Sequence, residues 1–384
     1  MAASLRGSTA IVGVGTAGIG QAPGFTHLEL LAQASARALG EAGLTFKDVD
    51  GLFAATLVNF FPTLAIGEYL GIRPKVTDGT NVGGSSFVDH VISAAMALNA
   101  GLCDVALICY GSNVRSGVGK HTTMADQPPY EAPYEPRMPI TAYALAAARH
   151  MHEYGTTRRH LAEVALAARK WAQLTPEASE RGPLTIDEVL TARMICDPLS
   201  LRDCCLVTDG AGAVVMVRAD RARDLKQKPV YFLGGAAAQW HRQISAMPDL
   251  TVSAAAESGA RAFAMARLKP HDIDVVQLYD AFTINVLLFL EDLGFCKKGE
   301  GGDFVSNEGI APGGHLPVNT NGGGLSYCHP GMYGIFLLVE AARQLRGQAE
   351  PARQVSGAEI ALCHGNGGTL SSQVTAIFGT EATL

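Results

Sequence analysis

The second half of this 384-residue chain repeats, in the same order, motifs found in its first half. The segment Leu44–Asp50 (LTFKDVD) is echoed by Leu268–Asp274 (LKPHDID), and each copy follows an expected helix and precedes an apolar strand. Two more pairs match, namely Gly83–Ser86 (GGSS) with Gly323–Ser326 (GGLS), and Ile108–Ser112 (ICYGS) with Leu362–Asn366 (LCHGN). Such ordered matches indicate an internal duplication. We therefore expect two similar layered α/β halves, with a crevice between them at strand ends and helix N-termini.

Hydrophobic patterning of the first half predicts alternating strands and helices. The expected strands are Ser8–Gly15, Val49–Leu57 and Val105–Tyr110, and the expected helices are Leu28–Gly43, Pro62–Leu70 and Phe87–Gly101. A proline-rich stretch followed by a helical stretch from Tyr143 to Ala172 interrupts the pattern and is interpreted as an insertion over the crevice. The expected units are a first half of 1–112 and 197–225, an inserted loop or lid domain of 113–196, and a second half of 226–384.

Composition excludes several classes of protein. With 48% hydrophobic and 17% charged residues the chain can bury a large core, and a net charge of −6 without a basic stripe argues against nucleic acid as a partner. None of the eight cysteines forms a CxxC pair, so we expect neither a metal site nor a disulfide framework. The apolar runs are too short to span a membrane and the N-terminus does not read as a signal peptide, so a cytoplasmic location is expected.

The segment Gly13–Gly18 (GVGTAG) matches the dinucleotide-binding pattern after a strand. That fingerprint needs a helix to open at its third glycine, so that helix amides face the pyrophosphate. Here Gly20, Pro23 and Gly24 follow at once, and helical periodicity begins only near His27. We interpret the segment as a strand leading into a loop.

Four glycine-rich segments carry unusual polar residues where strands end or helices begin. They are Asn81–Ser86 (NVGGSS), Leu278–Phe282 (LYDAF), Asn319–Gly334 (NTNGGGLSYCHPGMYG) and Leu362–Gly368 (LCHGNGG). Together these segments resemble the thiolase superfamily, whose motifs read Asn-Glu-Ala-Phe, Asn-x-x-Gly-Gly-x-x-x-x-Gly-His-Pro and Cys-x-Gly-x-Gly.

The resemblance covers the chain from Ser8 to Gly379 apart from the insertion. It implies an α/β thiolase-like fold, in which two duplicated βαβαβ halves form a five-layered α-β-α-β-α sandwich with an inserted loop domain. The layout is nearest the sterol-carrier-type thiolases and the thiolase-like aldolases that act on side chains of bulky acyl-CoAs.

The resemblance also implies roles for individual residues. His329 corresponds to the family's histidine at a helix opening, where a neutral imidazole serves as a base or polarising donor. Cys363 corresponds to the family's second cysteine, an acid/base at the α-carbon, although the neighbouring His364 could take that proton instead. Tyr279 replaces the family's asparagine and could donate to an oxyanion or exchange a proton with a substrate hydroxyl. The alternatives for these positions are a buried turn, a buried thiol and core packing.

Backbone groups complete the expected site. Gly324, Gly365, Asn366 and Gly367 are expected around the oxyanion or the CoA thioester, because glycines let a thioester approach backbone amides. The family's nucleophilic cysteine falls on Gly84, with Ser85 adjacent, and the first cysteine of the chain, Cys103, comes only after the following helix. A helix length of about 25 Å separates it from the position. Ser85 could replace the thiolate only with a base in hydrogen-bond reach.

Without the nucleophile, an acid/base site remains that can handle an acyl-CoA enolate, and retro-aldol cleavage of a β-hydroxyacyl-CoA needs only that. Two alternatives stay open: an acetyl-CoA acyltransferase with an atypical nucleophile, and a non-catalytic acyl-CoA or lipid-binding scaffold. No permanently bound cofactor is expected, since coenzyme A enters as part of the substrate. The resemblance implies a homodimer and, as in the thiolase-like aldolases, a small OB-fold, zinc-ribbon partner chain.

Overall fold

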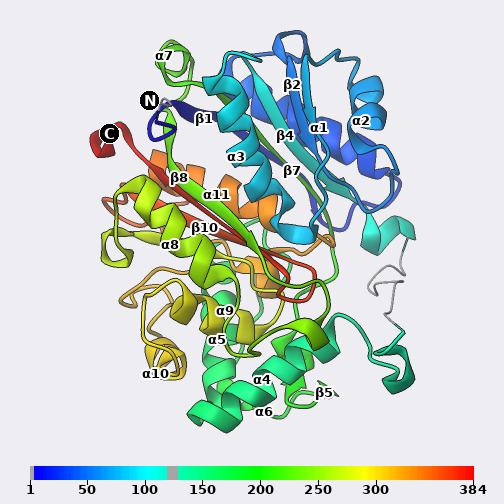
Figure 1. Cartoon of the computed structure of the whole chain (residues 1–384), viewed down its shortest axis with the longest axis vertical. Coiled ribbons are helices and arrows are strands. Elements are labelled where there is room, and N and C mark those ends of the chain that lie inside the picture. Colours follow the sequence, from blue (N-terminus) through cyan, green and yellow to red (C-terminus); the bar gives the residue numbers. More distant parts are fainter. Residues whose placement is uncertain (1–3, 119–128) are drawn as a thin grey trace.

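A computed structural model describes residues 4–118 and 129–384 (Figure 1). The first half contains β1 (Thr9–Gly20), α1 (His27–Ala42), β2 (Gly51–Ala54), α2 (Pro62–Leu70), β3 (Val76–Asp78), α3 (Ser86–Asn99), β4 (Ala106–Ser112) and β7 (Asp209–Arg218). The second half contains β8 (Val230–Gln239), α8 (Ala255–Ala266), β9 (Val275–Leu278), α9 (Thr283–Asp292), α10 (Gly301–Val305), α11 (Gly334–Arg346), β10 (Ile360–Gly367) and β11 (Ser372–Gly379). Between β4 and β7 lie α4 (Ile140–Tyr154), α5 (Arg158–Gln173), α6 (Ile186–Leu190), β5 (Met194–Cys196) and β6 (Leu199–Ser200), and α7 (Ala219–Ala222) follows β7.

Strand order confirms the duplication. In the first half β2-β4-β7-β1 are neighbours, and in the second half β9-β10-β11-β8 follow the same sequence of one parallel and two antiparallel pairings. The two sets join through a short β1–β8 pairing at Ala10–Tyr231 and Ile11–Val230, so the strands form one mixed nine-stranded sheet. The motif pattern did not indicate this hydrogen-bonded link, because it depends on how the two halves meet in space.

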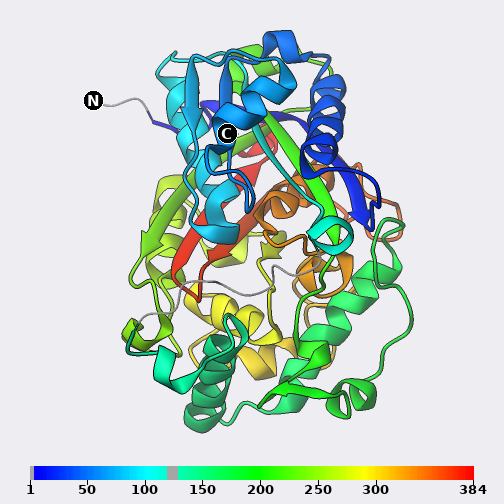
Figure 2. The same cartoon turned by 90° about the vertical axis from the view of Figure 1, so that its right-hand side faces the viewer.

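Helices lie in three layers around the strands (Figures 1 and 2). Helices α3 and α11 are central, since each packs against strands of both halves and against the other. Helix α1 covers the outer face of the first half, and α8 covers that of the second. The first-half strands and the second-half strands are thus the two β layers of the expected α-β-α-β-α sandwich, with α3 and α11 between them. The N-termini of α3 and α11 come together at the centre, where a Cβ at Gly334 would meet the Gly84 carbonyl.

Close helix packing explains the glycines of the Gly13–Gly18 segment. These residues lie inside β1, and a side chain at Gly13 would meet the backbone of α1, with its Cβ 2.0 Å from the Ala38 carbonyl oxygen. The helix begins only at His27, after a capping box between Thr26 and Glu29. The interpretation as a strand rather than a dinucleotide site is therefore supported by the local geometry.

The segment between β4 and β7 is helical over the expected range from Tyr143 to Ala172, but with a break that the sequence did not indicate. It breaks into α4 and α5 at Gly155, which adopts a left-handed φ of 72°, and Thr157 then caps α5. Helix α5 packs on the glycine-rich turn Gly323–Tyr327. Across residues 4–118 and 129–384, no helix combines the length and apolar character that crossing a membrane requires.

Candidate active site

Tyr279 and His329 meet at the centre of the molecule. Tyr279 follows β9, and its Oη lies 3.1 Å from Nε2 of His329, with the two rings edge to face. Burial lowers the pKa of His329 to about 4 and raises that of Tyr279, so both groups are neutral at pH 7. With the imidazole proton on Nδ1, the phenol donates to Nε2. The pair can therefore pass a proton from the phenol to the imidazole.

The N-terminus of α11 also points at the Tyr279 oxygen. The Tyr333 backbone N–H, directly before the helix, donates to this oxygen at 3.1 Å. A helix N-terminus carries partial positive charge and favours an anion. Negative charge developing on the phenol is therefore stabilised from this side. His329 itself lies in the turn before α11 rather than at the helix opening, and its lowered pKa comes from burial.

Gly84 is the position at which the Tyr279 ring leaves no room for a side chain. A Cβ at Gly84 would lie 2.1–2.3 Å from the ring and hydroxyl of Tyr279. Gly334 is equally tight, because its Cβ would lie 2.1 Å from the Gly84 carbonyl oxygen. The phenol thus fills the space that a side chain at position 84 would occupy.

Ser85 points away from this pair. Its hydroxyl lies 2.9 Å from Ser372 Oγ and 3.3 Å from the Val82 carbonyl oxygen, the two acceptors in reach of its single proton, and it is fully buried. Both partners are neutral oxygens, and neither can act as the base that an activated serine needs. The geometry therefore gives no support to Ser85 as a replacement nucleophile.

Cys363 lies in the core on β10. Its thiol donates to the Leu337 carbonyl of α11 at 3.4 Å, and burial raises its pKa. Its counterpart in the repeat, Cys109, is also fully buried, and burial raises its pKa to about 12. A thiol in such surroundings stays protonated and is a poor acid/base at neutral pH. The proposed family role of Cys363 is therefore not supported by its environment.

His364 and Asn366 belong to a buried polar chain. His364 Nδ1 contacts Thr375 Oγ1 at 2.9 Å and Nε2 contacts Gln373 Oε1 at 2.8 Å, and burial lowers the pKa of His364 to about 4. Gln373 donates to Asn366 Oδ1, and Asn366 Nδ2 donates to the hydroxyl of Tyr143 on α4. Since both ring nitrogens are engaged, His364 is better explained as a structural link than as a proton carrier.

The predicted glycines make close backbone contacts. A Cβ at Gly365 would lie 2.9 Å from Ser85 Cα, and one at Gly367 would lie 1.7 Å from the Val82 carbonyl oxygen. These two glycines therefore let β10 approach the turn before α3. Gly324 lies beside the pair, since its Cβ would be 3.2 Å from His329 Cδ2. A role for the three glycines around a thioester stays a prediction.

Asp280 and Thr208 are residues for which the sequence suggested no role. The buried Asp280 carboxyl accepts the Gly324 N–H at 2.6 Å and the Leu325 N–H at 3.3 Å, and burial raises its pKa to about 7. Thr208 accepts the His329 N–H through Oγ1 at 3.0 Å and donates its own N–H to the His329 carbonyl. Asp280 could have been singled out as an acid next to Tyr279, whereas Thr208 has no sequence signal.

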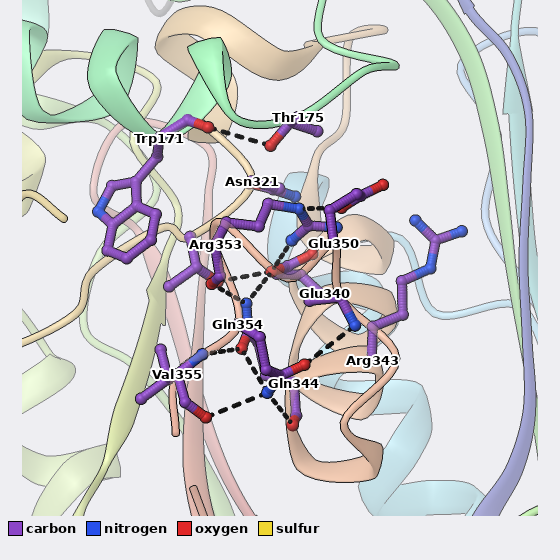
Figure 3. Close-up of polar contacts among 12 residues, drawn as sticks. Trp171, Thr175, Asn321, Glu340, Arg343, Gln344, Glu350, Arg353, Gln354 and Val355 are labelled. Atoms are coloured by element: carbon purple, nitrogen blue, oxygen red, sulfur yellow. Dashed lines mark hydrogen bonds and ion pairs between the residues drawn. The ribbon is translucent and has the colours of Figure 1, made fainter. Parts of the chain in front are cut away.

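A buried ion pair between Glu340 and Arg353 belongs to a polar network close to Asn321, at the start of the glycine-rich segment (Figure 3). Glu340 on α11 pairs with Arg353, which is 2% exposed, and also accepts hydrogen bonds from Gln344 and from Thr320 Oγ1, the latter at 2.6 Å. Thr320 in turn accepts from Gln277 on β9 at 2.9 Å. The network therefore ties α11 and β9, the two elements that lead to the site, to the start of the turn.

Comparisons with known proteins identify the family to which the chain belongs. A family model described as "Thiolase C-terminal domain-like" matches residues 236–380. The chain is 36% identical to the "17-hydroxy-3-oxo-4-pregnene-20-carboxyl-CoA lyase" of Mycobacterium tuberculosis, covering 93% of this chain and 96% of that one. The chain belongs to the thiolase superfamily. Within it, this superfamily member lies in the branch of sterol-carrier-type thiolases and steroid side-chain aldolases, as expected from its motifs.

Other relatives agree with the assignment of this thiolase-superfamily chain. The "Steroid side-chain-cleaving aldolase" of Thermomonospora curvata is 35% identical, covering 89% of this chain and 91% of that one, and the "Acetyl-CoA acetyltransferase" of Methanothermobacter thermautotrophicus is 34% identical, covering 96% and 98%. The solved "Ltp2-ChsH2(DUF35) aldolase" superposes with a TM-score of 0.89 at 32% identity over the whole of both chains. Human mitochondrial 3-ketoacyl-CoA thiolase, with a TM-score of 0.74 at 15% identity over 99% and 100%, shares the fold.

Proposed function

We propose that this chain is a nucleophile-free aldolase that cleaves a β-hydroxyacyl-CoA by a retro-aldol reaction. The class predicted from the sequence, a thiolase-like acyl-CoA lyase, agrees with full-length relatives described as a lyase and an aldolase. The observation that carries the proposal is the pairing of Gly84 with Tyr279, because the space for a nucleophilic side chain holds a phenol hydrogen-bonded to His329.

The reaction needs one proton acceptor and one oxyanion site. Tyr279 takes the proton from the substrate β-hydroxyl while passing its own proton to His329, which is unprotonated on Nε2 at pH 7 because burial lowers its pKa to about 4. The Cα–Cβ bond then breaks, its electron pair forms the thioester enolate, and the β-carbon leaves as a ketone or aldehyde. The proton held by the Tyr279–His329 pair then goes to Cα of the enolate, which gives the shorter acyl-CoA and restores the neutral pair. The Tyr333 N–H holds the Tyr279 oxygen in place and stabilises the partial negative charge that develops on it during the proton transfer.

We propose a bulky, steroid-like acyl group as the substrate class. The names of two full-length relatives refer to a pregnene carboxyl-CoA and to a steroid side chain. A substrate of this class would carry its hydroxyl on the ring carbon next to the carbon that bears the thioester. Cleavage would then give a ring ketone and a short acyl-CoA.

We also propose two kinds of assembly. A small DUF35-type partner chain, with the OB-fold and zinc ribbon expected from the resemblance, is supported by the assembly named in the solved aldolase structure. A homodimer is supported by an apolar surface beside β3, which in the described residues pairs only with β2 and so presents a free edge. Gly79, directly after β3, lies close to Pro62 and Thr63 at the start of α2. Exposed apolar side chains flank these two residues, with Phe60 88%, Phe61 62% and Leu64 69% exposed.

Product analysis tests the proposed reaction. The purified chain, alone and with a coexpressed DUF35-type partner, is incubated with a steroid β-hydroxyacyl-CoA, and ketone and acyl-CoA are quantified by liquid chromatography and mass spectrometry. Equimolar ketone and shortened acyl-CoA are expected, and His329→Ala should lower turnover at least about 100-fold. Tyr279→Phe should do the same. Formation of a longer ketoacyl-CoA from two acyl-CoAs would favour the acyltransferase instead, and unchanged turnover in both variants would remove this pair from the site.

A further inference from the structure

Tyr110, on β4 of the first half, reaches across to the turn that follows His329 in the second half. Its hydroxyl donates to the Pro330 carbonyl and accepts the Met332 N–H, the latter at 3.2 Å. The side chain is fully buried, and burial raises its pKa, so the phenol stays neutral. Tyr110 is thus a fixed donor and acceptor at the middle of this turn.

The bridged turn carries both groups that contact the Tyr279 oxygen. His329 lies immediately before it and supplies Nε2, whereas Tyr333 lies immediately after it and supplies the backbone N–H. The turn contains Gly331 in a left-handed conformation, with φ of 87°, and a Cβ there would lie 3.4 Å from the Tyr110 hydroxyl. A shift of the turn would therefore move both partners of Tyr279 together.

The same phenol also contacts the helix that begins beside Gly84. The Tyr110 ring lies against Phe87 of α3, with ring centroids 5.0 Å apart. The N-terminal end of α3, which follows Gly84, and the turn after His329 are therefore joined through the Tyr110 side chain. This places Tyr110 between the two positions that define the candidate site, although it touches neither Tyr279 nor His329 through a hydrogen bond in the described part of the chain.

The repeat shows that the fold alone does not demand such a bridge. The counterpart of Tyr110 in the second half is His364, whose ring nitrogens bond to Thr375 and Gln373 on the neighbouring strand of its own half. Tyr110 instead donates to the Pro330 carbonyl and accepts the Met332 N–H, both in the other half. Of these two equivalent residues, Tyr110 is therefore the one that bonds to the turn beside Tyr279 and His329.

We propose that Tyr110 is a positioning residue for the reaction, which sets the Pro330–Met332 turn so that His329 and the Tyr333 N–H meet the Tyr279 oxygen. This inference rests on the proposed function of the same site. A misplacement of about 1 Å can cost about 100-fold in rate, so loss of the bridge is expected in kcat more than in KM.

The experiment compares Tyr110→Phe with Ile108→Val. Ile108 is buried two residues earlier on β4, on the same face, and its substitution weakens the strand without removing a hydrogen bond. Steroid β-hydroxyacyl-CoA cleavage is measured together with thermal midpoints, and His329 is titrated by histidine NMR, with His329→Ala to assign the signal. If Tyr110→Phe fails to fold, Phe87→Leu takes its place, because it removes the ring that supports the phenol and keeps every hydrogen-bonding group.

Support would be a 10- to 100-fold fall in kcat with KM within about twofold, together with an NMR titration of His329 that differs from that of the unaltered chain. Ile108→Val should lower the thermal midpoint and leave kcat and the titration unchanged. The proposal is overturned if Tyr110→Phe lowers only the midpoint, as a purely structural residue would. If the unaltered enzyme cleaves no β-hydroxyacyl-CoA, the proposed reaction fails, while the titration still decides the role of Tyr110.

Discussion

At the scale of single residues, Gly84 and Tyr279 are mutually dependent. A side chain at 84 collides with the phenol ring, so Gly84→Ala should force Tyr279 away from His329. We expect a fall of at least about 100-fold in turnover and a loss of about 1–3 kcal/mol in the free energy of unfolding, typical of overpacking. Both are measured by kinetics and urea unfolding.

Gly40→Ala is the matched control for this change. Gly40 lies in α1 with open space around its Cβ position, so alanine should stabilise the protein by about 1 kcal/mol and leave turnover unaltered. Full activity in Gly84→Ala would contradict the account of the site.

The acid limb of the pH profile reports on His329. Because burial lowers its pKa to about 4, the imidazole is a neutral base over the whole range from pH 5 to 8. We expect kcat/KM to fall only as pH drops toward 4, rather than near the ordinary histidine value of about 6.5. An acid limb near 6.5 in the cleavage assay would show that the base is a different group.

At the scale of elements, the Glu340–Arg353 pair joins α11 to the segment that follows it, and Glu340 also accepts a hydrogen bond from Thr320 at the start of the glycine-rich turn. Arg353→Met would leave the buried Glu340 carboxylate without its cation, which costs about 3–5 kcal/mol in comparable buried pairs. The free energy of unfolding in urea measures this loss. Lys170→Met, which removes the partly exposed ion pair with Glu308, should change it by less than about 1 kcal/mol. Equal losses in the two variants would argue against a special role for the buried pair.

Much of the element order could be predicted from the sequence, because apolar periodicity and capping residues act locally. Helix α2 has the expected bounds, and α1 and α3 shift by one or two residues. The Gly155 break between α4 and α5 was missed because helical periodicity continues across it. The expected boundaries of the insertion, 113–196, stay a prediction.

The candidate site could be predicted only in part. Motif spacing identified Tyr279, His329 and Gly84, and the structure brings these three together. The Ser85 hydroxyl, in contrast, faces β11 rather than these three residues. Cys363 and His364 make their contacts within the core. Side-chain direction on a strand or at a helix start depends on the neighbouring layer, which a motif does not contain. Tyr110 and Thr208 act on the site from distant segments and were missed for the same reason.

At the scale of the whole molecule, the apolar surface beside β3 predicts self-association. Phe60→Glu with Phe61→Glu places two charges among exposed apolar side chains and should convert the expected homodimer into a monomer. Light scattering at micromolar concentration measures the mass. Replacing exposed Tyr134, which lies in the insertion, with Glu is the control and should leave the dimer intact. An unaltered chain that is monomeric at this concentration would contradict the proposed dimer.

The absence of a covalent intermediate is the central claim of this account. Intact-mass spectrometry after incubation with a β-hydroxyacyl-CoA, quenched during turnover, tests it most directly, because an acyl-enzyme is heavier by the acyl group. The account predicts an unchanged protein mass while ketone and shortened acyl-CoA accumulate. Ser85→Ala should keep most of its activity, since Ser85 contacts neutral oxygens rather than a base. A protein mass raised by the acyl group, with the adduct mapped to Ser85 and lost in Ser85→Ala, would contradict the aldolase mechanism.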